Sequence, residues 1–257
     1  MIVCKSAAEI GKMREASMLV AEVLAELAAQ VQPGVTTLEL DVEAERLVRA
    51  AGAEPAFKGY RGYPCTLCAS TNDEVIHGIP SKRSLVEGDI ISLDMGVKLN
   101  GFFGDSAVTV PVGRISDDAS ALLRVTRESL DKGIGQVRPG GRVSDIGHAI
   151  QAHVEAGGFS VVREFVGHGI GASLHEEPQI ANYGEPGRGP RLAEGMVLAI
   201  EPMVNLGRAA VQVLGDGWTA VTRDGSLSAH FEHTVAVTKD GPLVLTQPSA
   251  VGRGVRV

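Results

Sequence analysis

The chain has 257 residues, 44% of them hydrophobic, and a formal net charge of −7, which fits one large domain or two small ones with a substantial core. It contains no lysine–arginine block of the kind that binds nucleic acid, no apolar run of the ~18 residues that span a membrane, and no signal-peptide pattern at its N-terminus. These absences predict a cytoplasmic protein that binds neither nucleic acid nor a membrane directly.

The N-terminal part of the chain predicts two helices. Ser6-x-x-Glu9 is a capping box, and it opens a helix whose apolar residues follow one side of the helix until Pro33 closes it. A second run of apolar residues at helical spacing, over residues 38–51, ends at Gly52. A glycine at that position is typical of a helix C-terminus, so we expect the second helix to stop there.

The segment that follows predicts a loop and a β-hairpin. Residues 57–63 are rich in glycine and aromatic side chains and predict a loop. Strands are expected over residues 66–70, 89–95 and 106–112. Asn100-Gly101 is a strong turn signal between the last two strands, so we expect them to form an antiparallel pair.

The remaining chain predicts two further helices and several strands. The third helix is expected from Ser116 to about Gly133, and the fourth over residues 143–156. Strands are expected over residues 160–166, 196–201, 209–214 and 228–238. Residues 182–191 are rich in glycine and proline and predict a surface loop. No low-complexity linker divides the chain, so we expect a single domain over residues 1–257, with internal halves at roughly 6–112 and 113–240.

Two stretches of the chain repeat one pattern. Residues 87–94 and 194–201 both read Glu-Gly, then an apolar run, then a carboxylate, at an offset of 107 residues. Residues 30–34 and 136–140 share a second motif at an offset of 106 residues, and a predicted helix follows each copy. The agreement of the offsets predicts two α/β halves that face each other. Chance similarity between common motifs is the alternative explanation.

The two copies of the first motif end on Asp94 and Glu201. A charge at the end of an apolar strand is costly to bury unless it is paired, so a cation shared between the copies is the natural partner. Asp105 lies across the predicted hairpin turn from Asp94, and two carboxylates brought together there would raise each other's pKa unless a cation lies between them. For either aspartate alone, a solvent-exposed residue beside a turn is the simpler interpretation.

Further candidate ligands lie in the second half of the chain. His168 lies among glycines, which allow the backbone to approach a ligand closely, although a single loop histidine is often only a loop residue. Glu232 opens an apolar strand. One histidine with four carboxylates suits two divalent ions such as manganese, iron or cobalt better than a structural zinc. Two ions ~3.5–4 Å apart can activate a water and polarise a carbonyl, so the pattern predicts a hydrolase.

The cysteines do not indicate a second site. Cys4, Cys65 and Cys68 are odd in number and cannot all pair. Cys65-x-x-Cys68 could form half of a zinc site or a redox motif, but no second Cys-x-x-Cys occurs. Reduced thiols in a cytosolic protein are the simpler interpretation.

A specific set of motifs contains these residues. They are His77-Gly-Ile-Pro80, Asp94, Gly104-Asp105, Gly167-His-Gly-Ile-Gly171, His175-Glu-Glu-Pro178, Ile200-Glu-Pro-Met203 and Phe231-Glu-His-Thr234. By these motifs, nearly the whole chain resembles the type I methionine aminopeptidases of the creatinase-like, or pita-bread, metallopeptidase family. The resemblance implies an α+β fold in which two halves, related by a pseudo-twofold axis, form a curved antiparallel sheet covered by helices.

The resemblance also implies roles for individual residues. The ligands of two divalent ions (cobalt, manganese or iron) would be Asp94, Asp105, His168, Glu201 and Glu232. Asp105 and Glu232 would bridge the ions, and Glu201 would also take a proton from the attacking water. His175 would stabilise the negative charge that develops on the scissile carbonyl. His77 would hold the amide-nitrogen side of the bond.

A pocket for the methionine side chain follows from the same resemblance. The matching positions are Tyr60, Tyr63, Cys68, His77 and Trp218. An unbranched thioether suits an apolar pocket edged by aromatic rings. Leu174 stands where the family usually has an aromatic residue, and Phe57 where it usually has a small thiol, so both bear on the pocket's shape. Asn72 and Ser228 match a site for one monovalent cation.

The implied activity is removal of the N-terminal methionine from nascent polypeptides whose second residue is small. We expect a monomer with transient ribosome contact. A proline-directed aminopeptidase or prolidase shares the fold and ligand types, but such relatives usually carry an additional N-terminal domain. A type II enzyme would need a long insertion between His168 and Glu201, which this chain lacks. A non-catalytic binding protein of the same fold is a third alternative, although such proteins lose ligands.

Overall fold

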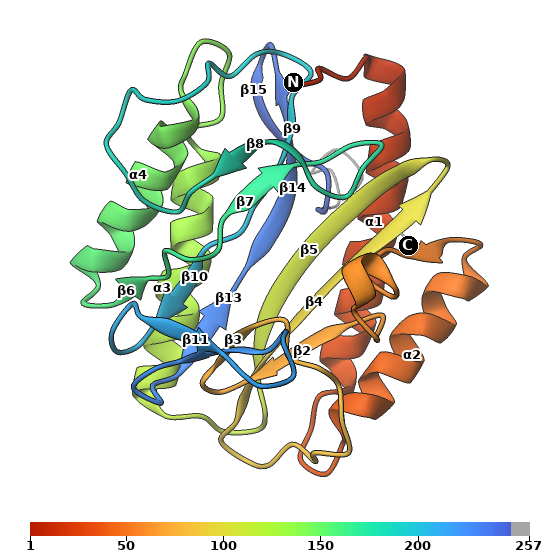
Figure 1. Cartoon of the computed structure of the whole chain (residues 1–257), viewed down its shortest axis with the longest axis vertical. Coiled ribbons are helices and arrows are strands. Elements are labelled where there is room, and N and C mark those ends of the chain that lie inside the picture. Colours follow the sequence, from red (N-terminus) through yellow and green to blue (C-terminus); the bar gives the residue numbers. More distant parts are fainter. Residues whose placement is uncertain (248–257) are drawn as a thin grey trace, which may run out of the picture.

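The computed structural model describes residues 1–247, and its centre is a curved antiparallel sheet of nine strands (Figure 1). Seven strands lie in the order β1 (Glu54–Pro55), β4 (Ile90–Leu99), β5 (Phe102–Pro111), β14 (Glu232–Thr238), β9 (Val197–Ile200), β7 (Gly167–Gly169) and β8 (Glu176–Ile180). Two more strands extend the sheet, β2 (Cys68–Thr71) beside β4 and β15 (Gly241–Val244) beside β14.

Two three-stranded sheets complete the strand structure of the described residues. One has the order β13 (Ser228–His230), β10 (Met203–Asn205) and β6 (Ser160–Val161). The other has the order β11 (Val211–Val213), β12 (Ala220–Thr222) and β3 (Glu74–Ile76). Both contain residues that lie far apart in the sequence, so neither could form from a local hairpin alone.

Helices flank the central sheet in two pairs, α1 and α2 on one side of the view and α3 and α4 on the other (Figure 1). They span α1 (Ala7–Gln30), α2 (Thr37–Ala50), α3 (Asp117–Ile134) and α4 (Val143–Ala156), and a 3₁₀ turn, η1, covers Tyr60–Gly62. The expected capping box of α1 is present, with Ser6 and Glu9 bonding each other's backbone amides. Among described residues, no helix combines the length and apolar character needed to cross a membrane.

Side-chain alternation along the strands separates the core from the opposite face of the sheet. The β4 residues that pack in the core with α1 and α2 are Ile91, Leu93, Met95 and Val97. Asp94 lies between two of these residues, so it faces away from the helices. On β14, Val235 and Val237 pack in the core with α3 and α4, so Glu232 also faces away. The carboxylates therefore gather on the sheet face that the helices leave uncovered.

The turn signal in the first hairpin is confirmed. Strands β4 and β5 are joined by Asn100 and Gly101 alone, and both residues have positive φ values, 53° and 83°. A two-residue turn of this type matches the right-handed twist of the strands. The strands pair over their whole length, from Ile90 with Pro111 to Leu99 with Phe102.

Several predicted elements differ from the structure. The strand expected over residues 160–166 extends only over Ser160–Val161, and the predicted loop over residues 57–63 contains the 3₁₀ turn η1. The strand expected over residues 228–238 is interrupted at Phe231 and belongs to two different sheets. Strands from both predicted halves lie in the same nine-stranded sheet, and the division into halves at 6–112 and 113–240 remains a prediction.

Helix α1 approaches the sheet closely at Gly104, where a Cβ atom would lie 2.6 Å from the backbone nitrogen of Ser17. We expect Gly104→Ala to lower the free energy of unfolding by about 1–3 kcal/mol, because helix backbone cannot rotate out of the way as a side chain can. Urea unfolding measures the change. Gly11→Ala, with no atom within 4 Å of the added carbon, is the control and should not destabilise. An unchanged midpoint for Gly104→Ala would contradict this expectation.

Candidate active site

The register of the central sheet brings three carboxylates together. Asp94 on β4 and Glu232 on β14 both pair with Ala107, which lies on β5 between them. Asp105 is two residues from Ala107 on the same strand and therefore shares its face of the sheet. Three neighbouring strands thus each present one carboxylate to the same region.

His168 and Glu201 join this group from the next strands. His168 on β7 pairs with Ala199 of β9, and Ala199 pairs with Thr234 of β14. Glu201 follows the last residue of β9. The Thr234 hydroxyl donates to the Asp105 carbonyl oxygen at 2.7 Å and accepts from the Asp105 amide at 3.2 Å, so it ties β14 to β5 beside the carboxylates.

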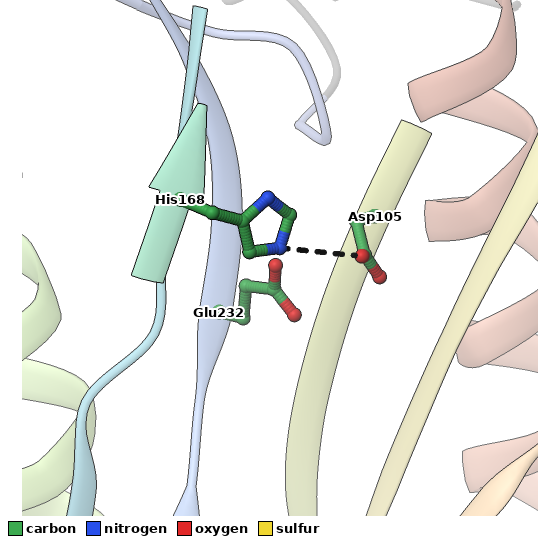
Figure 2. A group of neighbouring side chains, drawn as sticks. All are labelled: Asp105, His168 and Glu232. Atoms are coloured by element: carbon green, nitrogen blue, oxygen red, sulfur yellow. Dashed lines mark ion pairs between the residues drawn. The ribbon is translucent and has the colours of Figure 1, made fainter. Parts of the chain in front are cut away.

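Asp105, His168 and Glu232 form a compact group in which one potential ligand atom from each lies within 4.8 Å of the others. Their side chains point toward one another from β5, β7 and β14 (Figure 2). His168 Nε2 lies 3.9 Å from Asp105 Oδ2 and 3.6 Å from Glu201 Oε1. All of these side chains are buried.

The hydrogen bonding of His168 shows which ring nitrogen faces the carboxylates without a proton. Its Nδ1 lies 2.8 Å from the Gly169 carbonyl oxygen, which can only accept, so Nδ1 carries the proton. Burial lowers the pKa of His168 to about 4, so the ring is neutral near pH 7. Nε2 therefore presents a lone pair to the oxygens of Asp105 and Glu201. The Nε2 lone pair and the carboxylate oxygens are all electron-pair donors, and none of them can supply a proton to another. A cation held between them would satisfy all of them.

The electrostatics of the carboxylates lead to the same conclusion. Burial raises the pKa of Asp94, Glu201 and Glu232 well above the usual range, with repulsion between the carboxylates as the next cause. Burial also raises the pKa of Asp105, to about 7. Within residues 1–247, Asp105 Oδ1 and Glu232 Oε1 are buried without a hydrogen-bond partner. Divalent cations would satisfy both the unpaired oxygens and the excess negative charge.

We expect divalent ions to stabilise the fold measurably. A ligand that binds only the native state adds about 2.7 kcal/mol at 100 times its dissociation constant. Thermal unfolding of chelator-treated protein, with and without added Mn²⁺, measures this gain. Asp105→Asn should lose most of the ion-dependent increase in Tm because one buried negative charge is gone. An equal increase in wild type and variant would show that the ions act elsewhere.

A cavity of about 140 Å³ adjoins this group. It is lined by Phe57, Tyr60, Arg61, Tyr63, Cys68, Ile76, His77, Asp94, Asp105, His168, Leu174, His175, Glu201, Trp218 and Glu232. The structure thus brings together the five expected metal ligands and all the residues expected to contact substrate. Phe57 and Leu174, where the sequence departs from the usual family pattern, also lie on the wall.

His175 lies between the carboxylate group and an aromatic wall. Its ring is stacked on Tyr60 at a centroid distance of 5.2 Å, and its Nδ1 is 2.9 Å from the Tyr60 hydroxyl. The centroid of the His168 ring lies 4.2 Å from that of His175. The ring is thus held beside the candidate metal ligands.

His77 has a backbone conformation that is uncommon outside glycine. Its φ of 62° is in the left-handed region, which residues other than glycine adopt uncommonly. Burial lowers its pKa to about 4, so the ring is a neutral hydrogen-bonding group near pH 7. Trp218 packs edge-on against it at 6.0 Å and against Tyr63 at 5.1 Å. Strain of this kind is concentrated at functional sites.

The expected monovalent-cation residues lie next to each other but do not line this cavity. The Ser228 amide donates to the Asn72 carbonyl oxygen at 2.8 Å. The Asn72 side chain bonds Asp89 and the Ile90 amide, at 2.8 and 3.0 Å. A cation at this position therefore remains a prediction.

Some residues near the site could not be predicted from sequence. Arg61 and Ile76 line the cavity, although neither lies in a recognised motif. His230 is buried, with Nε2 4.0 Å from Glu201 Oε2, and the Asn182 amide group donates to the Glu201 carbonyl oxygen at 3.0 Å. Motif spacing gives no signal for such contacts, which depend on how separate strands pair.

Comparison with known proteins identifies the family of the chain. The profile of metallopeptidase family M24 matches residues 11–239. Methionine aminopeptidase 1 of Bacillus subtilis is 57% identical over 96% of this chain and 100% of its own length. The crystal structure of methionine aminopeptidase from Rickettsia prowazekii has a TM-score of 0.95 and 43% identity, over 96% of this chain and 100% of that one. Prolidase from Pyrococcus furiosus, at 22% identity and a TM-score of 0.78, shares the fold, and the alignment covers 66% of its chain.

These similarities confirm the pita-bread fold expected from the sequence and define a metallopeptidase that uses divalent metal. The match to prolidase supports the fold but not the activity, because its identity is low. The chain belongs to metallopeptidase family M24, among its type I methionine aminopeptidases.

Proposed function

We propose that this protein removes the N-terminal methionine from nascent polypeptides and peptides whose second residue is small. The observation that carries the proposal is one cavity lined by both the carboxylate–histidine group and the aromatic residues expected around a methionine side chain. A metal centre beside an apolar pocket can select one side chain and act on the bond next to it. The family and its nearly full-length relatives support the same activity.

We propose further that Asp94, Asp105, His168, Glu201 and Glu232 hold two divalent ions, with Asp105 and Glu232 shared between them. Cobalt, manganese and iron suit this set of mostly oxygen donors. When bound, such ions would polarise the scissile carbonyl and lower the pKa of a water molecule. The carboxylate of Glu201 would accept the proton that this water gives up.

The histidines would act on the two sides of the scissile bond. His175, oriented by the Tyr60 hydroxyl, would donate a hydrogen bond to the carbonyl oxygen as negative charge develops there. His77, neutral near pH 7, would hold the amide-nitrogen side. The methionine side chain would lie among Tyr60, Tyr63, Cys68 and Trp218.

Cellular context forms part of the proposal. We propose a cytoplasmic monomer that acts on nascent chains and makes at most transient contact with the ribosome. A monovalent cation near Asn72 and Ser228 would support the neighbouring sheet without taking part in the reaction. Fractionation of cells and sedimentation of the purified protein test the location and the oligomeric state.

Substrate specificity tests the proposed activity. We expect fast hydrolysis of Met-Ala-Ser and little or no hydrolysis of acetyl-Met-Ala-Ser or Met-Leu-Ser. A free amine can ligate one ion, whereas acetylation removes its lone pair and adds bulk at the closed end of the pocket. Leucine in second position would clash near His77 and His175. Liquid chromatography of the products, at saturating Mn²⁺ or Co²⁺, measures all three rates.

The same assay separates the alternatives. A proline-directed peptidase would hydrolyse Leu-Pro-Ser faster than Met-Ala-Ser, and that order would overturn the methionine assignment. A non-catalytic protein of this fold would bind peptide but hydrolyse none of the substrates, even with metal bound. Metal content measured on the same sample distinguishes that outcome from simple loss of ions.

A further inference from the structure

Lys5 precedes α1 and is a buried lysine, with its side chain 4% exposed. Its Nζ donates to Glu176 Oε2 at 2.6 Å and to the Val3 carbonyl oxygen at 3.0 Å. A lysine is rarely buried so fully unless its charge is paired, and this one is paired with a carboxylate 171 positions away. Neither Lys5 nor Glu176 is among the described residues that line the cavity.

Glu176 directly follows His175 and also fixes the turn that carries that histidine. Its Oε1 accepts a hydrogen bond from the Ser173 amide at 3.1 Å, while its Oε2 accepts from Lys5. The Gly171 amide donates to the Ser173 carbonyl oxygen at 3.1 Å. The Glu176 carboxylate thus binds the middle of the turn over residues 171–175 through one oxygen and Lys5 through the other.

The contact between Lys5 and this turn is tightly packed. A Cβ atom on Gly171 would lie 2.5 Å from Lys5 Cε and 2.6 Å from Glu176 Oε1. The Lys5 amide donates to the Gly195 carbonyl oxygen at 2.7 Å, and a Cβ atom on Gly195 would lie 2.6 Å from the Lys5 carbonyl oxygen. The absence of a Cβ atom at Gly171 and Gly195 therefore leaves just enough room for Lys5. The close packing fixes the position of the Lys5 ammonium group.

Two sets of contacts hold His175. The Tyr60 hydroxyl and ring orient the imidazole but do not bond its backbone. The backbone position depends on the turn braced by Glu176 and Lys5, and on the pairing of Glu176, at the start of β8, with Gly169 of β7. An imidazole that must meet a developing charge needs both kinds of support, because small displacements weaken such contacts steeply.

We propose that Lys5 is a positioning residue for the reaction, because its ammonium group fixes Glu176 and thereby the turn that presents His175 to the substrate carbonyl. The inference rests on the proposed function and deepens it. The segment before α1, which contributes no side chain to the cavity, would then help to arrange the active site.

Lys5→Met keeps the length of the side chain and removes its charge. We expect it to lower kcat on Met-Ala-Ser by about 10-fold to 100-fold, the range that follows a displacement of about 1 Å at a catalytic group. KM and metal content should change little, because the metal ligands and the pocket wall keep their own contacts. Lys132→Met, a loss of an exposed lysine on α3, is the matched control and should leave all three quantities unchanged.

A double-mutant cycle with His175→Ala distinguishes positioning from a general loss of stability. If Lys5 acts through His175, Lys5→Met should lower kcat less than about 2-fold in the His175→Ala background, because coupled residues are not additive. A structural defect would lower kcat by the same factor in both backgrounds. Equal factors, or an unchanged kcat for Lys5→Met in the presence of His175, would overturn the proposal.

Two further measurements apply if activity or folding fails. Should Lys5→Met not fold, Glu176→Gln enters the same cycle with the same expected outcomes. This variant keeps the acceptor for the Ser173 amide and removes the charged partner of Lys5.

The histidine Cε1–H NMR resonances provide a measurement that does not depend on enzymatic activity. The resonance of His175 is assigned by its absence in His175→Ala. Lys5→Met should shift or broaden the His175 signal and leave that of exposed His148 unchanged. An unshifted His175 signal overturns the positioning role, whereas an inactive wild type overturns only the proposed function.

Discussion

Asp105→Asn and Glu232→Gln are each expected to abolish hydrolysis of Met-Ala-Ser and to lower the content of bound divalent metal. Each substitution keeps the size of the side chain and removes one negative charge from a buried group. Asp105 Oδ1 and Glu232 Oε1 have no hydrogen-bond partner among residues 1–247, so both are available to cations. Loss of several kcal/mol of charge stabilisation corresponds to a rate decrease of about 1,000-fold or more.

Elemental analysis and steady-state rates, measured on the same samples, test this prediction. Glu185→Gln, in the exposed loop after β8, is the control for removing a carboxylate charge and should match wild type. A variant at Asp105 or Glu232 that retains two ions per chain and turns over at a near-normal rate would refute the assignment of that residue to both ions.

His175→Ala should lower kcat by about 100-fold to 1,000-fold while metal content stays the same. The proposed hydrogen bond strengthens only as the carbonyl oxygen gains charge, and loss of one such donor costs about 2.7–4 kcal/mol. The His168 ring lies only 4.2 Å away, so metal analysis is essential to this experiment. His148→Ala, at an exposed histidine on α4, is the control.

The outcome distinguishes two roles for His175. If the variant loses metal in proportion to activity, His175 is a ligand rather than a group that stabilises the developing charge. If kcat is lower and metal content is normal, comparison with Tyr60→Phe shows how much of the effect depends on orientation of the ring. That variant removes only the hydroxyl that lies 2.9 Å from Nδ1 and should lower kcat by a smaller factor.

Local signals in the sequence were sufficient to predict the helices and the first hairpin. Ser6 and Glu9 form their capping box within four residues, and Asn100-Gly101 forms its turn within two. Such elements depend on contacts between near neighbours, which the sequence displays directly. The bounds of α4, Val143–Ala156, match the expected range for the same reason.

Of the short strands, β2, β9 and β11 lie within or close to their expected ranges, whereas β3, β7, β8 and β10 were not predicted, because pairing with other strands rather than local pattern defines them. His168 lies on a three-residue strand that exists only through pairing with β8 and β9, although its glycine neighbours suggested a loop. The candidate ligands were recognised by motif, but their convergence depends on register, as in the pairing of both Asp94 and Glu232 with Ala107. The contact of Lys5 with Glu176 is likewise visible only once the chain has folded.

The single tryptophan of the chain gives this site an optical property. Trp218 lines the cavity and packs edge-on against Tyr63 and His77, so all indole emission from the protein originates at one wall of one pocket. Occupation of that pocket by an apolar side chain, or binding of a paramagnetic ion nearby, should change the intensity or wavelength of this emission. The unlabelled protein therefore contains its own fluorescent reporter, with which ligand binding can be titrated even in variants that no longer turn over.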